Sequence, residues 1–146
     1  MKAFKQIETD PDVAIGLANS ALESILKEIL KDERLEISIK GSETLYDLTK
    51  KLVKKFNFLD EEHPVEVKTI GSSLLAVCQA IENLRCNSTN FHGKTADDYL
   101  IDDTLYAYFI VNSVSTVGLY INSYYKELYP VQENLETANL EDDLPF

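Results

Sequence analysis

The segment "DPDVAIGLANSALESILKEIL", residues 10–30, decides the fold class of this chain. Its apolar residues recur three or four positions apart, as one face of a helix requires: Ala14, Leu17, Ala18, Ala21, Leu22, Ile25 and Ile29. Asp10 is a candidate N-cap, and Pro11 occupies the first helical position, where its missing N–H costs no hydrogen bond. The segment therefore predicts an amphipathic helix over about residues 11–31.

Apolar residues recur at helical spacing in three further segments, over about 43–56, 65–85 and 96–128. In the link over residues 32–41, apolar and polar residues alternate, which predicts a short extended piece. The connections between the segments are short, as they are in helical bundles. The sequence therefore predicts an all-α fold, with a bundle of four to five helices over residues 1–129.

Acidic residues cluster where the last of these helices is expected to start. Thr95 and Asp98 have the spacing of a capping box, and Asp97, Asp102 and Asp103 lie close by in the sequence. Asp98 and Asp102 would share a helix face, which suits a hard cation. Stabilisation of the helix dipole explains the cluster without a metal. We expect neither a metal site nor a cofactor.

The sequence also bears on the compartment of the protein. No apolar run reaches the roughly 18 residues that a membrane-spanning helix needs. The first residues, "MKAFKQIETD", lack the apolar core of a secretory signal. Cys78 and Cys86 lack a CxxC spacing, so a disulfide scaffold is not expected. These features predict a cytoplasmic protein.

Negative charge is concentrated in residues 130–146, "PVQENLETANLEDDLPF", which contain five acids and no base. Few apolar residues interrupt this segment, so it is expected to form a disordered acidic tail. The whole chain has a net charge of −11. Such a charge opposes nonspecific binding of nucleic acid, for which a basic surface is expected.

The stretch "LRCNSTNFHG", residues 84–93, contains one of the two arginines, Arg85, and one of the two histidines, His92. Arginine matches a phosphate with a planar fork of donors, and histidine exchanges protons near neutral pH. The pair suits metal-independent cleavage of RNA, although one histidine cannot comfortably act as both base and acid. Structural roles explain the same residues: Arg85 would pair with Glu82, and His92 would cap carbonyls in the core.

Three stretches resemble the abortive-infection C-terminal domain family of the HEPN superfamily. Residues 10–30 resemble the opening of that family, and "LYDLTKKL", residues 45–52, looks like its second helix. "ENLRCNSTNFHG", residues 82–93, resembles its signature of Leu-Arg-Asn, a short polar stretch and His-Gly. The resemblance covers about residues 9–128.

The resemblance implies a function and a site. Many members of the superfamily are toxin ribonucleases of phage defence or toxin–antitoxin systems, and they act as dimers. By position, Arg85 and His92 would be the catalytic pair, with RNA as substrate and an antitoxin as a further partner. Cys86 stands where the family usually has a polar residue, so Asn87 or Asn90 is expected to support the site in its place.

Four lysines form a basic face on the second predicted helix: Lys50, Lys51, Lys54 and Lys55. Their spacing of one, four and five residues places them on adjacent positions of a helix surface. The face would guide RNA phosphates, hold the acidic tail, or serve as an ordinary solvated surface.

The last six residues, "EDDLPF", resemble the acidic tip of bacterial single-stranded-DNA-binding proteins. Such tips recruit replication and repair enzymes, and here the tip comprises Asp142, Asp143, Leu144, Pro145 and Phe146. A plain solubilising tail, or an autoinhibitory tail over a basic groove, explains the same residues. The second functional hypothesis is therefore an inactive dimerisation or sensor module that recruits DNA-processing partners through its tip.

Overall fold

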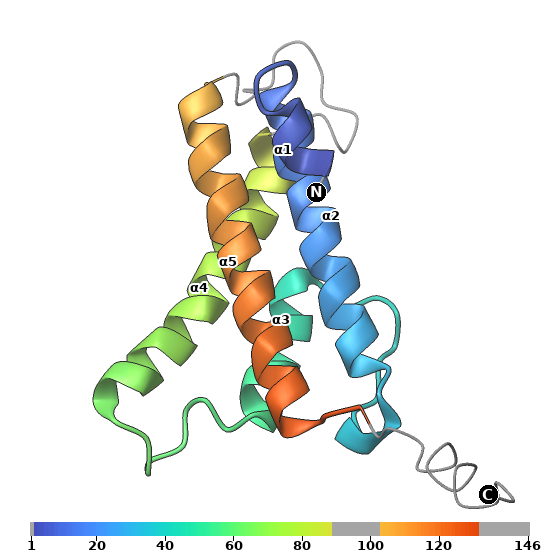
Figure 1. Ribbon diagram of the computed structural model, residues 1–146, viewed down its shortest axis with the longest axis vertical. Helices are drawn as coiled ribbons and strands as arrows, with labels where there is room; N and C mark the ends of the chain where they lie inside the picture. Colours follow the sequence, from blue (N-terminus) through green and yellow to red (C-terminus); the bar gives the residue numbers. More distant parts are fainter. Residues whose placement is uncertain (1, 89–102, 132–146) are drawn as a thin grey trace, which may run out of the picture.

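The computed structural model describes residues 2–88 and 103–131, and every regular element among them is helical (Figure 1). In chain order the elements are α1 (Lys2–Gln6), α2 (Pro11–Leu30), the 3-10 turn η1 (Glu33–Leu35), α3 (Leu45–Lys55), α4 (Val65–Ser88) and α5 (Thr104–Leu128). The prediction of an all-α bundle is confirmed. Residues 130–146 were predicted to be a disordered tail, and all but the first two lie outside the described residues.

The centre of the molecule is the pair formed by α2 and α5, which run side by side along its long axis (Figure 1). Leu22 of α2 and Val114 and Ile121 of α5 are buried between the helices of the bundle. A Cβ atom placed on Gly118 of α5 would lie 3.5 Å from the Cδ1 atoms of both Leu22 and Ile25. The side chains of α2 therefore reach close to the backbone of α5 at this point.

A capping box starts α3 and sets its position against α4. The Thr44 hydroxyl accepts from the Asp47 N–H at 3.2 Å, and the Asp47 carboxylate accepts from the Thr44 N–H at 3.1 Å. The next N–H, on Leu45, donates to the Glu82 carboxylate of α4 at 3.3 Å. An acid near a helix N-terminus is favourable, so Glu82 joins the start of α3 to the last third of α4.

The two halves of α4 differ in burial. In the second half, Leu74, Cys78 and Ile81 are buried, as the predicted apolar stripe requires. In the first half, Val67 is 36% exposed and Ile70 is 56% exposed. Val67 and Ile70 continue the apolar spacing of the segment over residues 65–85, but they stay exposed because the first half of α4 diverges from the other helices (Figure 1).

The link after α2 contains no strand, although its side chains alternate as predicted. Leu35 is buried and Ile37 and Ile39 are half-buried, whereas Glu36 and Ser38 are exposed. Within the described residues no second segment pairs with the link, and the 3-10 turn η1 takes up its first part. The alternation therefore reflects contact with the helical core on one side of the link, and not a sheet.

The start of α5 differs from the prediction. The helix begins at Thr104, where a start near residue 96 was expected. Asp103 is its N-cap, with extended backbone angles, and its carboxylate accepts from the N–H of Leu105 at 2.8 Å. Asp103 therefore stabilises the start of the helix, which is one of the two roles expected for the acidic cluster. Thr95, Asp97, Asp98 and Asp102 lie outside the described residues.

Among the described helices, α5 is long and apolar enough to cross a membrane by length and composition alone. One third of its most apolar 18-residue window is buried in the bundle. Its buried side chains lie on one face, which packs against α2: Ala107, Ile110, Val111, Val114, Val117 and Ile121. The remaining face is also rich in apolar side chains, which the packing against α2 does not require.

A polar cluster fixes the other end of α5. Arg34 donates to both carboxylate oxygens of Asp32, with its Nη2 atom 2.6 Å from Oδ2. It also donates to the backbone carbonyls of Tyr129 at 3.1 Å and Pro130 at 2.8 Å. The Tyr125 hydroxyl donates to Asp32 from α5 itself. We call Asp32, Arg34 and Tyr125 the carbonyl clamp, because they hold the chain just after α5.

Candidate functional site

The last turn of α4 contains Arg85, Cys86 and Asn87, and the helix ends at Ser88. The side chains of these residues are not described, and Asn90 and His92 lie outside the described residues. Position 85 follows Ile81 by four residues and Cys78 by seven. Such spacings return to one helix face, and Cys78 and Ile81 on that face are buried.

The predicted motif lies at one end of the molecule. The C-terminus of α4, the N-terminus of α5 and α1 meet at this end, which we call the motif end (Figure 1). The Tyr108 hydroxyl of α5 donates to the Glu8 carboxylate at 3.2 Å, which joins α5 to the segment after α1.

Apolar side chains are exposed at the motif end. Leu105 is 72% exposed and Phe109 is 71% exposed, and both belong to the first two turns of α5. Leu119, further along the helix, is 67% exposed. We call these three residues the outer face of α5. Clustered exposed apolar residues mark contact surfaces more often than isolated ones do.

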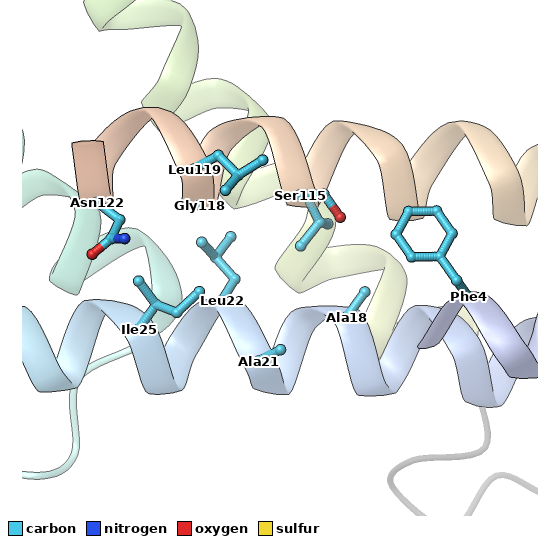
Figure 2. Close-up of a pocket in the computed structure, with 10 residues that line it drawn as sticks. Phe4, Ala18, Ala21, Leu22, Ile25, Ser115, Gly118, Leu119 and Asn122 are labelled. Atoms are coloured by element: carbon cyan, nitrogen blue, oxygen red, sulfur yellow. The ribbon is translucent and has the colours of Figure 1, made fainter. Parts of the chain in front are cut away.

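A groove of about 310 Å³ lies between α2 and α5, next to the outer face. Figure 2 shows Phe4, Ala18, Ala21 and Leu22 on one side of it and Ser115, Gly118 and Leu119 on the other. The Ser115 hydroxyl is already bonded to the Val111 carbonyl at 2.8 Å. None of the described residues that line the groove is titratable, so their chemistry suits a contact surface and not a hydrolytic site.

The four lysines of α3 divide into two pairs with different surroundings. Lys51 donates to the Ser38 carbonyl at 2.6 Å and to the Glu43 carboxylate at 3.3 Å. Lys50 lies over the Tyr46 ring, 5.9 Å from its centroid. For Lys54 and Lys55, the described part of the chain contains no ion pair. Among the described contacts, Lys54 and Lys55 thus have neither an ion pair nor a ring contact and are free to bind an anionic group.

Glu43 is held as an anion by its neighbours. The Lys40 N–H donates to its carboxylate at 2.6 Å, the Gly41 N–H donates at 2.8 Å, and Lys51 adds a positive charge. These contacts, the Lys40 N–H first, lower the pKa of Glu43 to about 2. Lys51 and Glu43 thus fix the link to α3 and have a structural role.

Lys54 and Lys55 do not lie beside Arg85. The start of α3 contacts Glu82, whereas Lys54 at the other end of α3 shares a hollow with Leu75 of α4. Ten residues separate Leu75 from Arg85, which is about 15 Å along a helix at 1.5 Å per residue. The structure therefore does not bring the free lysines together with the predicted catalytic arginine.

The two cysteines share one helix and are too far apart to form a disulfide with each other. Cys78 and Cys86 are eight residues apart on α4, or about 12 Å along the axis, beyond the ~7 Å limit between Cα atoms. Burial raises the pKa of the Cys78 thiol, so this side chain is neutral and unreactive at neutral pH.

Sequence reasoning missed two features. The carbonyl clamp joins Arg34 to residues more than 90 positions away, and only the rarity of arginine in this chain pointed to it. Asn19 of α2 is fully buried, and neither its Oδ1 nor its Nδ2 atom has a hydrogen-bond partner among the described residues. A buried amide without a partner is costly, which makes Asn19 a marked exception in this core.

Comparison with known families gives one match. The model of the abortive-infection C-terminal family, described as a HEPN-like domain, matches residues 1–125. The chain belongs to this HEPN-like family. The matched residues of the HEPN-like chain include Arg85 and His92 and end before the acidic tail. No curated protein and no solved structure matches the chain.

Proposed function

We propose that this HEPN-like protein is a metal-independent endoribonuclease of phage defence that acts in the cytoplasm as a dimer. One observation carries the proposal: Arg85 lies in the last turn of α4, and His92 follows it by seven residues in the sequence, within the residues that the family model matches. The family membership supports a role in abortive infection, and the chemistry of the pair supports RNA as the substrate.

The proposed reaction needs no group beyond the protein and the RNA. His92 removes the proton of a ribose 2′-hydroxyl, whose oxygen then attacks the adjacent phosphorus. The bond from phosphorus to the 5′-oxygen breaks, and that oxygen takes up a proton. Arg85 stabilises the negative charge that develops on the phosphoryl oxygens. The products are a 2′,3′-cyclic phosphate and a 5′-hydroxyl.

A dimer would solve the problem of having one histidine for two proton transfers. Each chain has a single Arg85–His92 pair, so a second copy brings the second histidine. The outer face of α5 supports this arrangement, because Leu105 and Phe109 are exposed at the motif end. A second copy seated on this face would cover both side chains and bring the two pairs close together.

Induced expression in a bacterium tests the catalytic role. We expect growth arrest and fragmented RNA with the wild-type protein, and normal growth with Arg85→Ala or His92→Ala. His63→Ala is the matched control, since it removes the other histidine, which lies between α3 and α4, and it should remain toxic. The purified protein should give 5′-hydroxyl ends in the presence of a metal chelator.

The second candidate function is an inactive dimerisation or sensor module that recruits DNA-processing partners through its acidic tip. The net charge of −11 favours it, because an acidic surface binds RNA weakly at physiological salt. That hypothesis predicts a different pattern. Deletion of residues 144–146 would abolish protection against phage, while His92→Ala would change nothing. This outcome, with no RNA cleavage by the purified wild-type protein, would overturn the ribonuclease proposal.

A further inference from the structure

A groove of about 700 Å³ lies beside the end of α3, between this helix and the link that follows η1. Lys51, Lys54 and Lys55 line one side of it, and Ile37 and Tyr129 also contribute. Glu36 is the only acid in its lining. We call this hollow the α3-end groove. It combines positive charge with apolar surface, which is the chemistry that an acidic segment with apolar residues would recognise.

The free lysines give the groove unused positive charge. Lys51 is bonded to Ser38 and Glu43, but Lys54 and Lys55 have no ion pair among the described residues. Lys54 is exposed and Lys55 is half-exposed. Two ammonium groups next to each other repel, so an anionic occupant would relieve this repulsion as well as bind.

The chain leaves the bundle at this same groove. Tyr129 lines the groove, and the carbonyl clamp holds the carbonyls of Tyr129 and Pro130. The Arg34 guanidinium also lies over the Tyr129 ring, 5.6 Å from its centroid. The starting point of the following segment is therefore fixed within reach of Lys54 and Lys55.

We propose that residues 132–146 of the same chain bind in the α3-end groove. Their five carboxylates would face Lys54 and Lys55, and their apolar side chains would lie against Ile37. Fifteen residues span up to about 50 Å when extended, far more than the groove requires. Because the segment is tethered, its effective concentration is on the order of millimolar, so weak contacts are sufficient.

This inference is independent of the ribonuclease proposal, since none of the described residues that line the α3-end groove belongs to α4. Nucleic acid is the competing occupant, because phosphates would also bind the free lysines. The acidic segment of a second copy is the other competing occupant of the groove. The acidic segment is favoured by its tether and by the overall charge of −11, which repels nucleic acid.

Nuclear magnetic resonance of the full ¹⁵N-labelled chain tests the proposal. The first variant keeps the tail length but removes its charge by changes to amides: Glu133→Gln, Glu136→Gln, Glu141→Gln, Asp142→Asn and Asp143→Asn. The second is Lys54→Glu with Lys55→Glu. We expect both to shift the amide signals of residues 35–38 and 51–57. Both should also raise the mobility of the tail amides to that of a free peptide.

The matched control is Lys2→Glu with Lys5→Glu, which reverses two exposed charges on α1, at the motif end. It should leave the tail signals unchanged. Raising NaCl to 0.5 M should release the tail of the wild-type chain, because salt screens such contacts. Shifts confined to the groove between α2 and α5, shifts that grow with protein concentration, or no shifts would each overturn the proposal.

Discussion

The two ends of α5 differ in their contacts with the rest of the chain. At its C-terminal end, the Asp32 carboxylate, the Arg34 guanidinium and the Tyr125 hydroxyl form the carbonyl clamp, which holds the backbone close to η1. At its N-terminal end, Leu105 and Phe109 are left largely in solvent. The first end is satisfied within one chain. The second end, next to the predicted motif, leaves apolar side chains exposed in a single chain, and the proposed dimer would cover them.

The largest expected effect comes from a charge on the exposed end. Phe109→Asp should convert the dimer to a monomer and lower ribonuclease activity by about 100-fold or more, because each proton transfer then lacks its partner histidine. Light scattering and the cleavage assay measure the two effects. Leu128→Asp, at the clamped end and 49% exposed in the wild type, is the matched control and should stay dimeric and active. Equal behaviour of the two variants would remove the contrast between the ends.

Two buried glycines, Gly71 of α4 and Gly118 of α5, differ in the space around them. A Cβ on Gly71 would lie 3.0 Å from Phe58 Cβ and 3.1 Å from its carbonyl oxygen, so Gly71→Ala forces a backbone shift. We expect a loss of roughly 1–2 kcal/mol, overpacking outweighing the gain in helix propensity.

Gly118→Ala is the counterpart, because its new methyl group would meet only side-chain atoms at 3.5 Å. It should raise the free energy of unfolding by up to about 1 kcal/mol, the usual gain of alanine over glycine in a helix. Urea denaturation measures both variants. A stabilising Gly71→Ala would mean that Phe58 and α4 separate easily.

The buried amide of Asn19 supplies a third test, on the helix that faces α5. Asn19→Leu keeps the number and the branching of the side-chain heavy atoms and removes two polar atoms that have no partner among the described residues. The free energy of unfolding should rise by roughly 1–2 kcal/mol. Asn83→Leu, an exposed site on α4, should change it by less than about 0.5 kcal/mol. A destabilised Asn19→Leu variant would show that the amide has a partner in the folded protein.

The carbonyl clamp should make the Tm of the protein depend on pH in the acid range. Hydrogen bonds from Arg34 first, and then from Tyr125, lower the pKa of Asp32 well below its ordinary value. A carboxyl with a depressed pKa in the folded state stabilises above its unfolded pKa of about 4 and loses this effect as pH falls below it. Arg34→Gln should therefore lower the Tm at pH 7 and flatten its decline below about pH 4. An unchanged decline would place the acid sensitivity elsewhere, for example at Glu43.

Local rules in the sequence predicted much of the bundle. Pro11 and the spacing from Ala14 to Ile29 placed α2 to within a residue at each end. The family resemblance was also confirmed, over residues 1–125. These succeeded because capping, helix periodicity and family signatures are each contained in short stretches of sequence.

The features that the sequence did not reveal depend on contacts that spacing along the chain does not specify. Val67 and Ile70 fit an apolar stripe, but burial required a neighbour that the bundle does not provide there. Spacing does not reveal that Lys50 lies over the Tyr46 ring and that Lys51 pairs with Glu43, and the roles of the four lysines remain predictions. Spacing also does not reveal that Arg34 meets Tyr129 and Pro130. The catalytic roles of Arg85 and His92 remain predictions.

The carbonyl clamp has a consequence for how such a protein changes over time. Because Arg34 holds the backbone carbonyls of Tyr129 and Pro130, the chain just after α5 is fixed to η1 by contacts that do not involve residues 132–146. Residues 132–146 can then be exchanged for another segment while the bundle keeps its structure. Such an exchange would remove the proposed contact with the α3-end groove, but the fold of the bundle should persist as long as Asp32, Arg34 and Tyr125 are kept.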